Sequence, residues 1–101
     1  MSEMLATPDA ELFRRYAESR SEEAFGELVR RHRNLVYCAA LRRTNDPQVA
    51  EDISQSVFAE LSRRAGPLVR HATLTGWLYT TTRFSATTAI SIYQREMARF
   101  K

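Results

Sequence analysis

Apolar residues recur at every third or fourth position between residues 46 and 65, and this spacing predicts an amphipathic helix. Asn45 or Asp46 can cap the start of this helix. Pro47 suits its first position, because a proline lacks the N–H that would be unbonded there. At about 100° per residue, one face of the helix carries Ala50, Ile53, Val57 and Leu61.

The opposite face of this helix has a composition that suits contact with another protein. It carries Gln48, Glu51, Asp52, Gln55, Ala59 and Ser62. Small residues stand here beside carboxylates and amides, so a second helix can approach closely and find hydrogen-bond partners. The alternative is a face that is only solvated, which is the usual role of a charged helix surface.

The same spacing predicts two helices before this one. The first has Thr7 as its cap and Pro8 at its first position, and it ends near Ser19. Ser21 caps the second, which extends to about Arg43. The predicted apolar stripes are Leu12, Phe13 and Tyr16 in the first helix, and Ala24, Phe25, Leu28, Val29, Leu35, Val36 and Ala39 in the second.

His32 falls in the middle of the apolar stripe of the second helix. We therefore predict a buried, hydrogen-bonded histidine rather than a ligand or a catalytic base. Tyr37 and Leu41 lie on the outer face of the same helix, so part of that face is expected to be covered as well.

A break over residues 66–75 begins with a glycine-proline pair, which predicts the end of the third helix. Thr73 or Thr75 then caps a last helix that extends to about Arg99. Its predicted inner face consists of Leu74, Leu78, Ala89 and Ile92, with Thr81, Ser85 and Thr88 on or beside it. Four helices and no alternating strand pattern predict an all-α bundle, a single domain over residues 1–101.

Composition narrows the class of protein. The net charge is +3, but acids outnumber bases seven to three up to Glu27, and bases outnumber acids twelve to five after it. A basic second half suits an anionic partner. The chain has no long apolar run and its start lacks the pattern of a signal peptide, so we expect a cytoplasmic protein without a membrane span.

Catalytic chemistry has little support in the sequence. The chain has no glycine-rich phosphate loop, and His32, Cys38 and His71 are too few and too scattered for a metal site. Glu51 and Asp52 are adjacent, so they point about 100° apart on a helix and do not readily share a ligand. We therefore expect no catalytic residue, no metal and no cofactor, and an unrelated small enzyme is the weakest interpretation.

Recognition of nucleic acid has more support. Tyr79 and Arg83 lie on one side of the last helix, and an aromatic ring beside an arginine suits an unpaired base and its phosphate. Trp77 and Phe84 lie on another side, where Trp77 has a core position as its alternative. The candidate DNA-binding residues are Arg70, His71, Trp77, Tyr79, Thr80, Arg83 and Thr87. Arg70 and His71 fall in the predicted break, where simple solvation is the alternative.

Three short motifs resemble region two of bacterial sigma-70 family factors, most closely the extracytoplasmic-function (ECF) group. The first is Glu23-Ala24-Phe25, then Leu28-Val29 and His32. The second is Ala50-Glu51-Asp52, then Gln55 and Phe58. The third is Gly76-Trp77-Leu78-Tyr79, then Arg83. Their order and spacing match, and the resemblance extends from about residue 9 to residue 83.

The resemblance implies a non-catalytic domain for transcription initiation. Such a domain binds the clamp helices of the beta-prime subunit of core RNA polymerase and captures the melted minus-ten promoter element as single-stranded DNA. It implies that Gln48, Glu51, Asp52 and Gln55 bind polymerase. It also implies that the segment before the last helix holds a flipped base, that Arg83 and its helix face recognise the promoter, and that an anti-sigma factor is a candidate partner.

The sequence also departs from the pattern of that family. Ser56, Phe84 and Thr88 replace an acidic residue, an asparagine and an aspartate that are common there, and residues 90–94 lack the usual dense basic charge. The chain stops before a region-four domain, so a fragment or a truncated product is expected. The alternative function is a sigma-like interaction domain that binds polymerase or a regulator without reading DNA.

Overall fold

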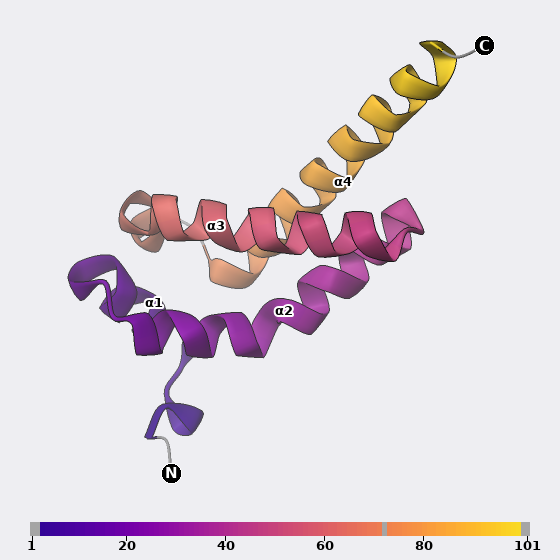
Figure 1. Ribbon diagram of the computed structural model, residues 1–101. Coiled ribbons are helices and arrows are strands. Elements are labelled where there is room, and N and C mark those ends of the chain that lie inside the picture. Colours follow the sequence, from indigo (N-terminus) through magenta and orange to yellow (C-terminus); the bar gives the residue numbers. More distant parts are fainter. Residues whose placement is uncertain (1–2, 72, 100–101) are drawn as a thin grey trace.

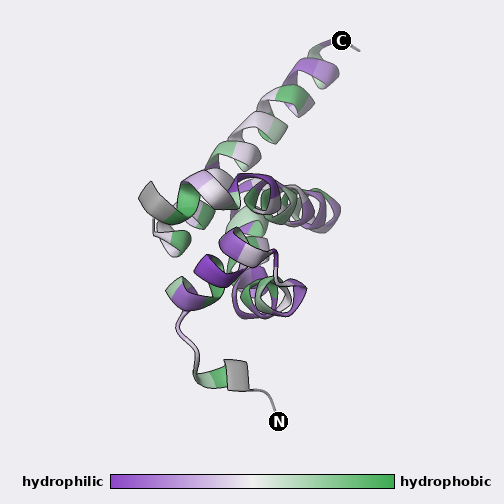
Figure 2. Cartoon of the chain, turned by 90° about the vertical axis from the view of Figure 1, so that its left-hand side faces the viewer, coloured by the Kyte–Doolittle hydropathy of each residue, from purple (hydrophilic) through white to green (hydrophobic). Residues whose placement is uncertain are grey.

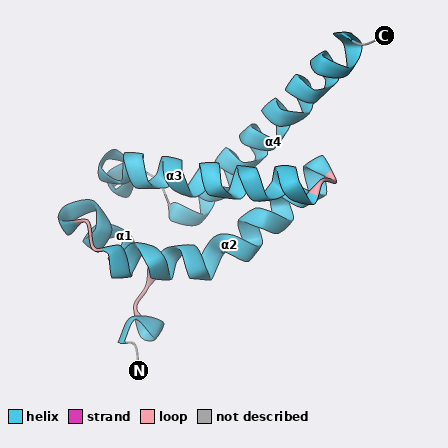
Figure 3. Cartoon of the chain, in the orientation of Figure 1, coloured by secondary structure: helices cyan, strands magenta, loops and turns pink. Residues whose placement is uncertain are grey.

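The computed structural model describes residues 3–71 and 73–99, and every regular element in these ranges is a helix (Figure 3). The elements are a 3₁₀ turn η1 (Glu3–Ala6) and the helices α1 (Asp9–Ser19), α2 (Glu22–Thr44), α3 (Pro47–His71) and α4 (Leu74–Arg99). The prediction of a small all-α bundle with four helices is confirmed. Figure 1 shows α2 and α3 running alongside each other, joined by a tight turn.

Side-chain caps define where three of these helices begin. The Ser21 hydroxyl accepts a hydrogen bond from the N–H of Ala24 at the start of α2. Asp46 caps α3, because its Oδ1 accepts from the N–H groups of Gln48 and Val49. Thr73 accepts through its hydroxyl at the start of α4. These three predictions are confirmed.

The predicted cap of the first helix is wrong by one residue. Pro8 rather than Thr7 occupies the cap position of α1, and it makes no side-chain hydrogen bond there. The carbonyl of Pro8 accepts from the N–H groups of Glu11 and Leu12. The fixed φ of the proline, −63°, suits the entry of the chain into the helix.

The prediction that the glycine-proline pair ends the third helix is also wrong, because α3 continues past Pro67 to its end at His71. Pro67 has no N–H to donate to the carbonyl of Arg63, and this weakens the helix locally. Ala65 is fully buried and two residues beyond the proline pack partly buried against the core, so tertiary packing offsets the loss. These two residues are Leu68 and Val69.

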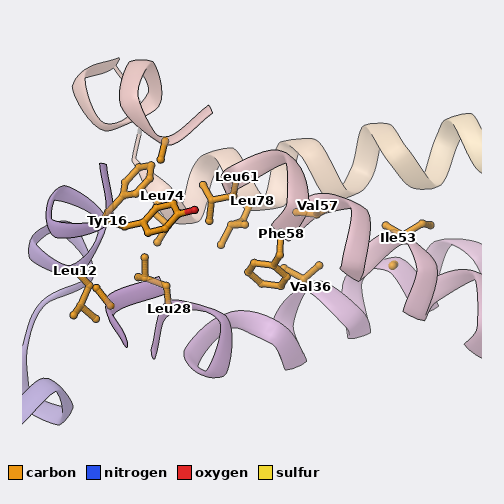
Figure 4. Packing of buried hydrophobic residues seen from close by; sticks show 14 of the residues in the cluster. Leu12, Tyr16, Leu28, Val36, Ile53, Val57, Phe58, Leu61, Leu74 and Leu78 are labelled. Atoms are coloured by element: carbon orange, nitrogen blue, oxygen red, sulfur yellow. The ribbon is translucent and has the colours of Figure 1, made fainter. Parts of the chain in front are cut away.

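The core lies between the four helices, which all contribute to it (Figure 4). On α3 the predicted stripe is confirmed, and Phe58 is buried beside it. The fully buried residues with the largest side chains are Leu12, Leu28, Leu61, Leu78, Val36, Val57 and Thr82. Burying each leucine contributes about 1.5–3 kcal/mol relative to leaving it exposed.

Two predicted stripes are shifted from the observed ones. On α2, Leu35 is exposed and Ala40 is buried. The expected cover over the outer face of α2 is confirmed, because Tyr37 and Leu41 are partly buried against the core. On α4, the small residues that pack closely are Thr82 and Ala86 rather than Thr81, Ser85 and Thr88. The other helices therefore contact a narrower face of α4 than the positions of its apolar residues predict.

Ile92 is predicted on the inner face of the last helix, and it is instead half-exposed. The reason is the direction of α4, whose carboxyl-terminal half extends beyond the bundle, as both views show (Figures 1 and 2). Tyr93 and Met97 are exposed on the same projecting segment. In Figure 2 hydrophobic positions continue along this segment although no other helix covers it.

Within the part of the chain that the structure describes, no helix has the length and hydropathy of a membrane span. The same residues contain no group of three or more His, Cys, Asp or Glu side chains placed to hold a metal ion.

Candidate functional site

The four candidate polymerase-binding residues lie exposed on the first two turns of α3 and just beyond. Gln48 donates from Nε2 to Oδ1 of Asp52 at 3.1 Å, and Gln55 donates from Nε2 to Oε1 of Glu51 at 3.5 Å. Each amide therefore holds a carboxylate one helical turn away. Among the described residues no cationic side chain pairs with either carboxylate. This surface, the α3 ridge, offers two carboxylates that lack a cationic partner in the described part of the chain.

Grooves flank the α3 ridge on both sides. The groove towards α2 has a volume of about 440 Å³, and Glu51 and Gln55 line it together with Phe58. Ser54 also lines it, and the buried Ser54 Oγ has no hydrogen-bond partner among the described residues. The groove towards α4 has about 380 Å³ and is lined by Asp52. The ridge therefore stands between two depressions that side chains of a docking helix can enter.

Ser62 is predicted to belong to this ridge as a small open residue, but the structure assigns it to the fold. Its hydroxyl is 2.7 Å from the hydroxyl of Tyr16, and its carbonyl accepts from Nη1 of Arg20 at 3.0 Å. Ser62 thus joins α3 to α1 and is only partly exposed. Ala59 remains exposed, so it is the small residue over which a partner can approach closely.

The exposed face of α4 carries most of the candidate DNA-binding residues. The guanidinium of Arg83 lies over the ring of Tyr79, 5.6 Å from its centroid, in a cation–π contact. The Tyr79 side chain is half-exposed, and Thr80 and Thr87 are exposed near it on the same helix. This α4 face places an aromatic ring, a cation and hydroxyl groups together.

Trp77 lies between its two predicted roles. It is partly buried and packs against the core, and it also lines the groove between α3 and α4. Trp77 follows the first turn of α4, in which the cap residue Thr73 lies close to Gly76. The N–H of Gly76 donates to Oγ1 of Thr73 at 3.3 Å. A Cβ at Gly76 would lie 2.8 Å from that hydroxyl oxygen, so a side chain there would displace the cap.

The segment before α4 differs from the prediction at Arg70 and His71. Their backbone belongs to the last turn of α3 and not to a loop. Their side chains lie outside the described part of the structure, so their predicted DNA contact stays a prediction.

Two residues near the α4 face were not among the predicted site residues. Arg43, in the last turn of α2, lines a shallow hollow with Thr80, Arg83 and Thr87. Phe84 forms another part of its lining and is 72% exposed. The spacing of seven between Trp77 and Phe84 is visible in the sequence, but the approach of Arg43 to α4 depends on how the helices pack.

A second polar cluster joins α1 to α2. Asp9 accepts from Arg31 Nη1 at 2.9 Å and from His32 Nε2 at 2.7 Å. Arg31 also donates from Nε to Glu27 Oε2 at 2.9 Å, and Arg30 pairs with the other Glu27 oxygen at 2.7 Å. The Glu27 side chain is only 4% exposed, and no sequence pattern singled it out. The predicted hydrogen bond of His32 is confirmed, and its predicted burial is only partial, with its side chain 12% exposed.

The charges of this cluster stabilise one another. Partial burial of Asp9 opposes its ionisation, but hydrogen bonds from Arg31 and His32 outweigh burial and lower the pKa of Asp9. Because an ionised carboxylate only accepts hydrogen bonds, His32 carries a proton on Nε2. Hydrogen bonds to Glu27 and Asp9 raise the pKa of Arg31. These interactions join α1 to α2, and each carboxylate and guanidinium of the cluster pairs with an oppositely charged group of the same cluster.

The arginines whose side chains the structure describes fall into two groups. Carboxylates pair with Arg14, Arg15, Arg30, Arg31, Arg63, Arg64 and Arg99. Among the described side chains, no carboxylate pairs with Arg20, Arg33, Arg42, Arg43, Arg83 or Arg95. Arg20 instead bonds to the carbonyl of Ser62 and stacks on Tyr16. The unpaired guanidinium groups thus include two at the α4 face.

Comparison with known protein families gives a match over most of the chain. The model of the family described as Sigma-70 region 2 matches residues 28–96, which are 69 of the 101 residues. The matched segment starts within α2 and includes the α3 ridge and the α4 face. No match was found among curated proteins. None was found among solved structures.

Proposed function

The chain belongs to the sigma-70 region 2 family, and from this premise we propose that it docks on core RNA polymerase and captures the melted minus-ten promoter element as single-stranded DNA. Family membership supports a region 2 role in transcription initiation. The finer assignment to the ECF group is part of the proposal. So are a non-catalytic role, a cytoplasmic location and an anti-sigma factor as a further partner.

The observation that carries the proposal is the separation of two exposed surfaces with opposite chemistry. The α3 ridge presents Glu51 and Asp52 without a cationic partner, whereas the α4 face presents Arg83 without a carboxylate partner among the described residues. Carboxylates suit a basic partner helix, such as a clamp helix of polymerase. A guanidinium beside an aromatic ring suits the phosphates and bases of an unpaired strand.

Removing two side chains from the α3 ridge tests polymerase docking. We expect the double variant Asp52→Ala and Gln55→Ala to weaken binding to core polymerase by roughly 2–5 kcal/mol. Basic side chains of polymerase would then be buried in the interface without the hydrogen bonds that Asp52 and Gln55 supply. Both residues are exposed, so the variant should keep the wild-type melting temperature. Glu22→Ala removes an exposed carboxylate at the start of α2, outside both grooves, and is the control. Wild-type affinity of the double variant would refute this docking surface.

Oligonucleotide titration tests capture of the promoter strand. The domain should bind a single-stranded minus-ten-like oligonucleotide in the micromolar range or more weakly, and should prefer it to the duplex. The ratio of single-strand to duplex affinity should be lower in Tyr79→Ala and in Arg83→Ala than in the wild type, when measured at a low and at a high salt concentration. Arg14→Gln removes the same charge from α1 and is the control for net charge.

One observation favours the interaction-only alternative. The projecting end of α4 exposes apolar side chains, Ile92 and Tyr93, where the family usually carries dense basic charge. Equal or tighter binding of the duplex, or no binding of any strand even with core polymerase present, would favour that alternative.

A further inference from the structure

A hollow lies between the end of α2 and the middle of α4, and Arg43, Thr80, Arg83, Phe84 and Thr87 line it. Its volume is about 240 Å³. Sites that enclose drug-sized ligands typically measure about 300–1,000 Å³, so this hollow suits a smaller group such as one base or one phosphate. It is formed by two helices whose contributing residues lie far apart in the chain.

The charge of the hollow is uncompensated. Among the described residues, neither Arg43 nor Arg83 has a carboxylate partner, and no acidic side chain lines the hollow. By contrast, Arg63 and Arg64, on α3, both pair with Glu60. The fork of a guanidinium matches the oxygens of a phosphate, and two such groups at one hollow suit a polyanion.

Phe84 gives the hollow an aromatic wall. Its side chain is 72% exposed, the largest fraction among the exposed large hydrophobic residues of the described chain. A phenylalanine has no polar atom that would favour this exposure. Stacking on an unpaired base would cover the ring, because every base offers a π-face.

We propose that Arg43, Arg83 and Phe84 form a binding site for one nucleotide of a single DNA strand, in which Phe84 stacks on the base and the two arginines hold adjacent phosphates. The hydroxyls of Thr80 and Thr87 supply hydrogen bonds to the sugar or to the base edge. This site rests on the proposed function, and it adds to it a residue of α2 and an aromatic wall.

Phe84 also lines the grooves between α3 and α4, so a protein partner that docks in those grooves is the alternative to a base stacked on its ring. The unpaired cations and hydroxyls beside the ring favour nucleic acid on the Arg43 side. Binding of polymerase is therefore measured in parallel with binding of DNA in each variant.

The experiment titrates a promoter fork with a single-stranded minus-ten segment against the full chain, alone and with core polymerase. Phe84→Leu keeps an apolar side chain but removes the π-face, and we expect it to weaken strand binding about 5- to 150-fold. An abasic nucleotide is then placed at each position of the strand in turn. At the base that Phe84 covers, the abasic loss and the Phe84→Leu loss should not add.

Arg43→Gln tests the second element of the site. We expect the slope of log affinity against log salt concentration to become shallower by about 0.7 for each phosphate that the variant no longer neutralises. Arg42→Gln removes the same charge from the neighbouring position, which does not line the hollow, and is the matched control. Its salt slope should stay close to that of the wild type.

The outcomes separate this site from the broader proposal. Wild-type affinity and salt slope in both Phe84→Leu and Arg43→Gln, while Tyr79→Ala still weakens strand binding, would overturn the site and leave the proposed function intact. Loss of polymerase binding in Phe84→Leu, with strand binding unchanged, would assign Phe84 to a protein contact. Failure of the wild-type chain to bind any strand, with or without polymerase, would overturn promoter capture itself and this site with it.

Discussion

The junction of α1 with α2 and the exposed face of α4 use arginine in opposite ways. At the junction, Arg31 meets Asp9 and Glu27, two carboxylates from two helices. At the α4 face, Arg83 lies over the ring of Tyr79, and neither Arg83 nor Arg43 has a carboxylate partner among the described residues. The first arrangement completes its interactions within the chain, whereas the second leaves charge available to an external anion.

Hydrophobic side chains show the same contrast. Leu12 and Leu28, from α1 and α2, are fully buried near the junction. Phe84, Ile92 and Tyr93 on α4 are all more than half-exposed. Since α4 extends beyond the bundle, its outer half contributes little to the core (Figure 1). We infer that the junction acts mainly in stability and the α4 face mainly in recognition, and each of the following predictions tests one side of this contrast.

The largest effect on stability is expected at Glu27. Breaking a buried ion pair by removing one partner costs roughly 3–5 kcal/mol. The side chains of Arg30 and Arg31 are partly exposed, so water can hydrate their charges once the carboxylate is gone. We therefore expect Glu27→Ala to lower the free energy of unfolding by about 2–3 kcal/mol. Chemical denaturation measures this change in the free energy of unfolding. Glu60→Ala, which removes a carboxylate paired with exposed arginines, should cost no more than about 1 kcal/mol. Equal losses in the two variants would contradict the assignment.

His32→Ala should have the next largest effect. It removes a largely buried ring and its hydrogen bond to Asp9, so we expect a loss of about 1–2 kcal/mol. Strand binding per folded molecule should not change, because His32 belongs to the junction. A variant of normal stability that no longer binds DNA or polymerase would transfer His32 to the recognition surface.

Acid should weaken the junction through Asp9. Its pKa is lowered in the folded state, so its contribution is fully present above the unfolded pKa and is lost as the pH falls through the folded pKa. Asp9→Asn should cost about 1 kcal/mol at neutral pH, and the difference from the wild type should vanish in strong acid. Unfolding free energies measured across the range from neutral pH to strong acid check this. A difference that does not depend on pH would mean that Asp9 acts through shape rather than charge.

The smallest effect on stability is expected at the α4 face. Arg83→Gln removes no ion pair of the described structure, so the free energy of unfolding should change by less than about 0.5 kcal/mol. The same variant should bind the promoter strand more weakly and with a shallower salt dependence. A destabilisation comparable to that of His32→Ala would remove the contrast between the two regions.

Much of the fold could be predicted from local patterns. The caps Ser21, Asp46 and Thr73 and the apolar stripe of α3 follow from residue type and spacing, because capping and helix periodicity act within a few residues. The predicted end of α3 is wrong, because the burial of Ala65 and its neighbours overrides the local effect of Pro67.

The candidate site was only partly accessible to such reasoning. The α3 ridge follows from positions along one helix, so its four residues could be grouped in advance. The hollow at the α4 face joins Arg43 to Arg83, forty residues apart, and no spacing rule relates them. The ion pair from Arg31 to Asp9 joins two helices and was missed for the same reason. Glu27 and Arg31 stand four residues apart on α2, so their pairing follows from spacing, and only the burial of Glu27 depends on packing.

Residue order was sufficient to specify the helices, most of their starts and the family of the chain, because these depend on residues that are close in the sequence or on motifs at set spacings. The packing of the helices determined which charged side chains are buried with a partner and which remain exposed without one. Packing brings α1 against α2, where Glu27 is buried among arginines, and directs α4 away from the bundle, where Phe84 stays exposed. Most ion pairs form within one helix, but burial and the pairs that Asp9 makes with α2 depend on distances across helices, and those distances exist only once the chain has folded.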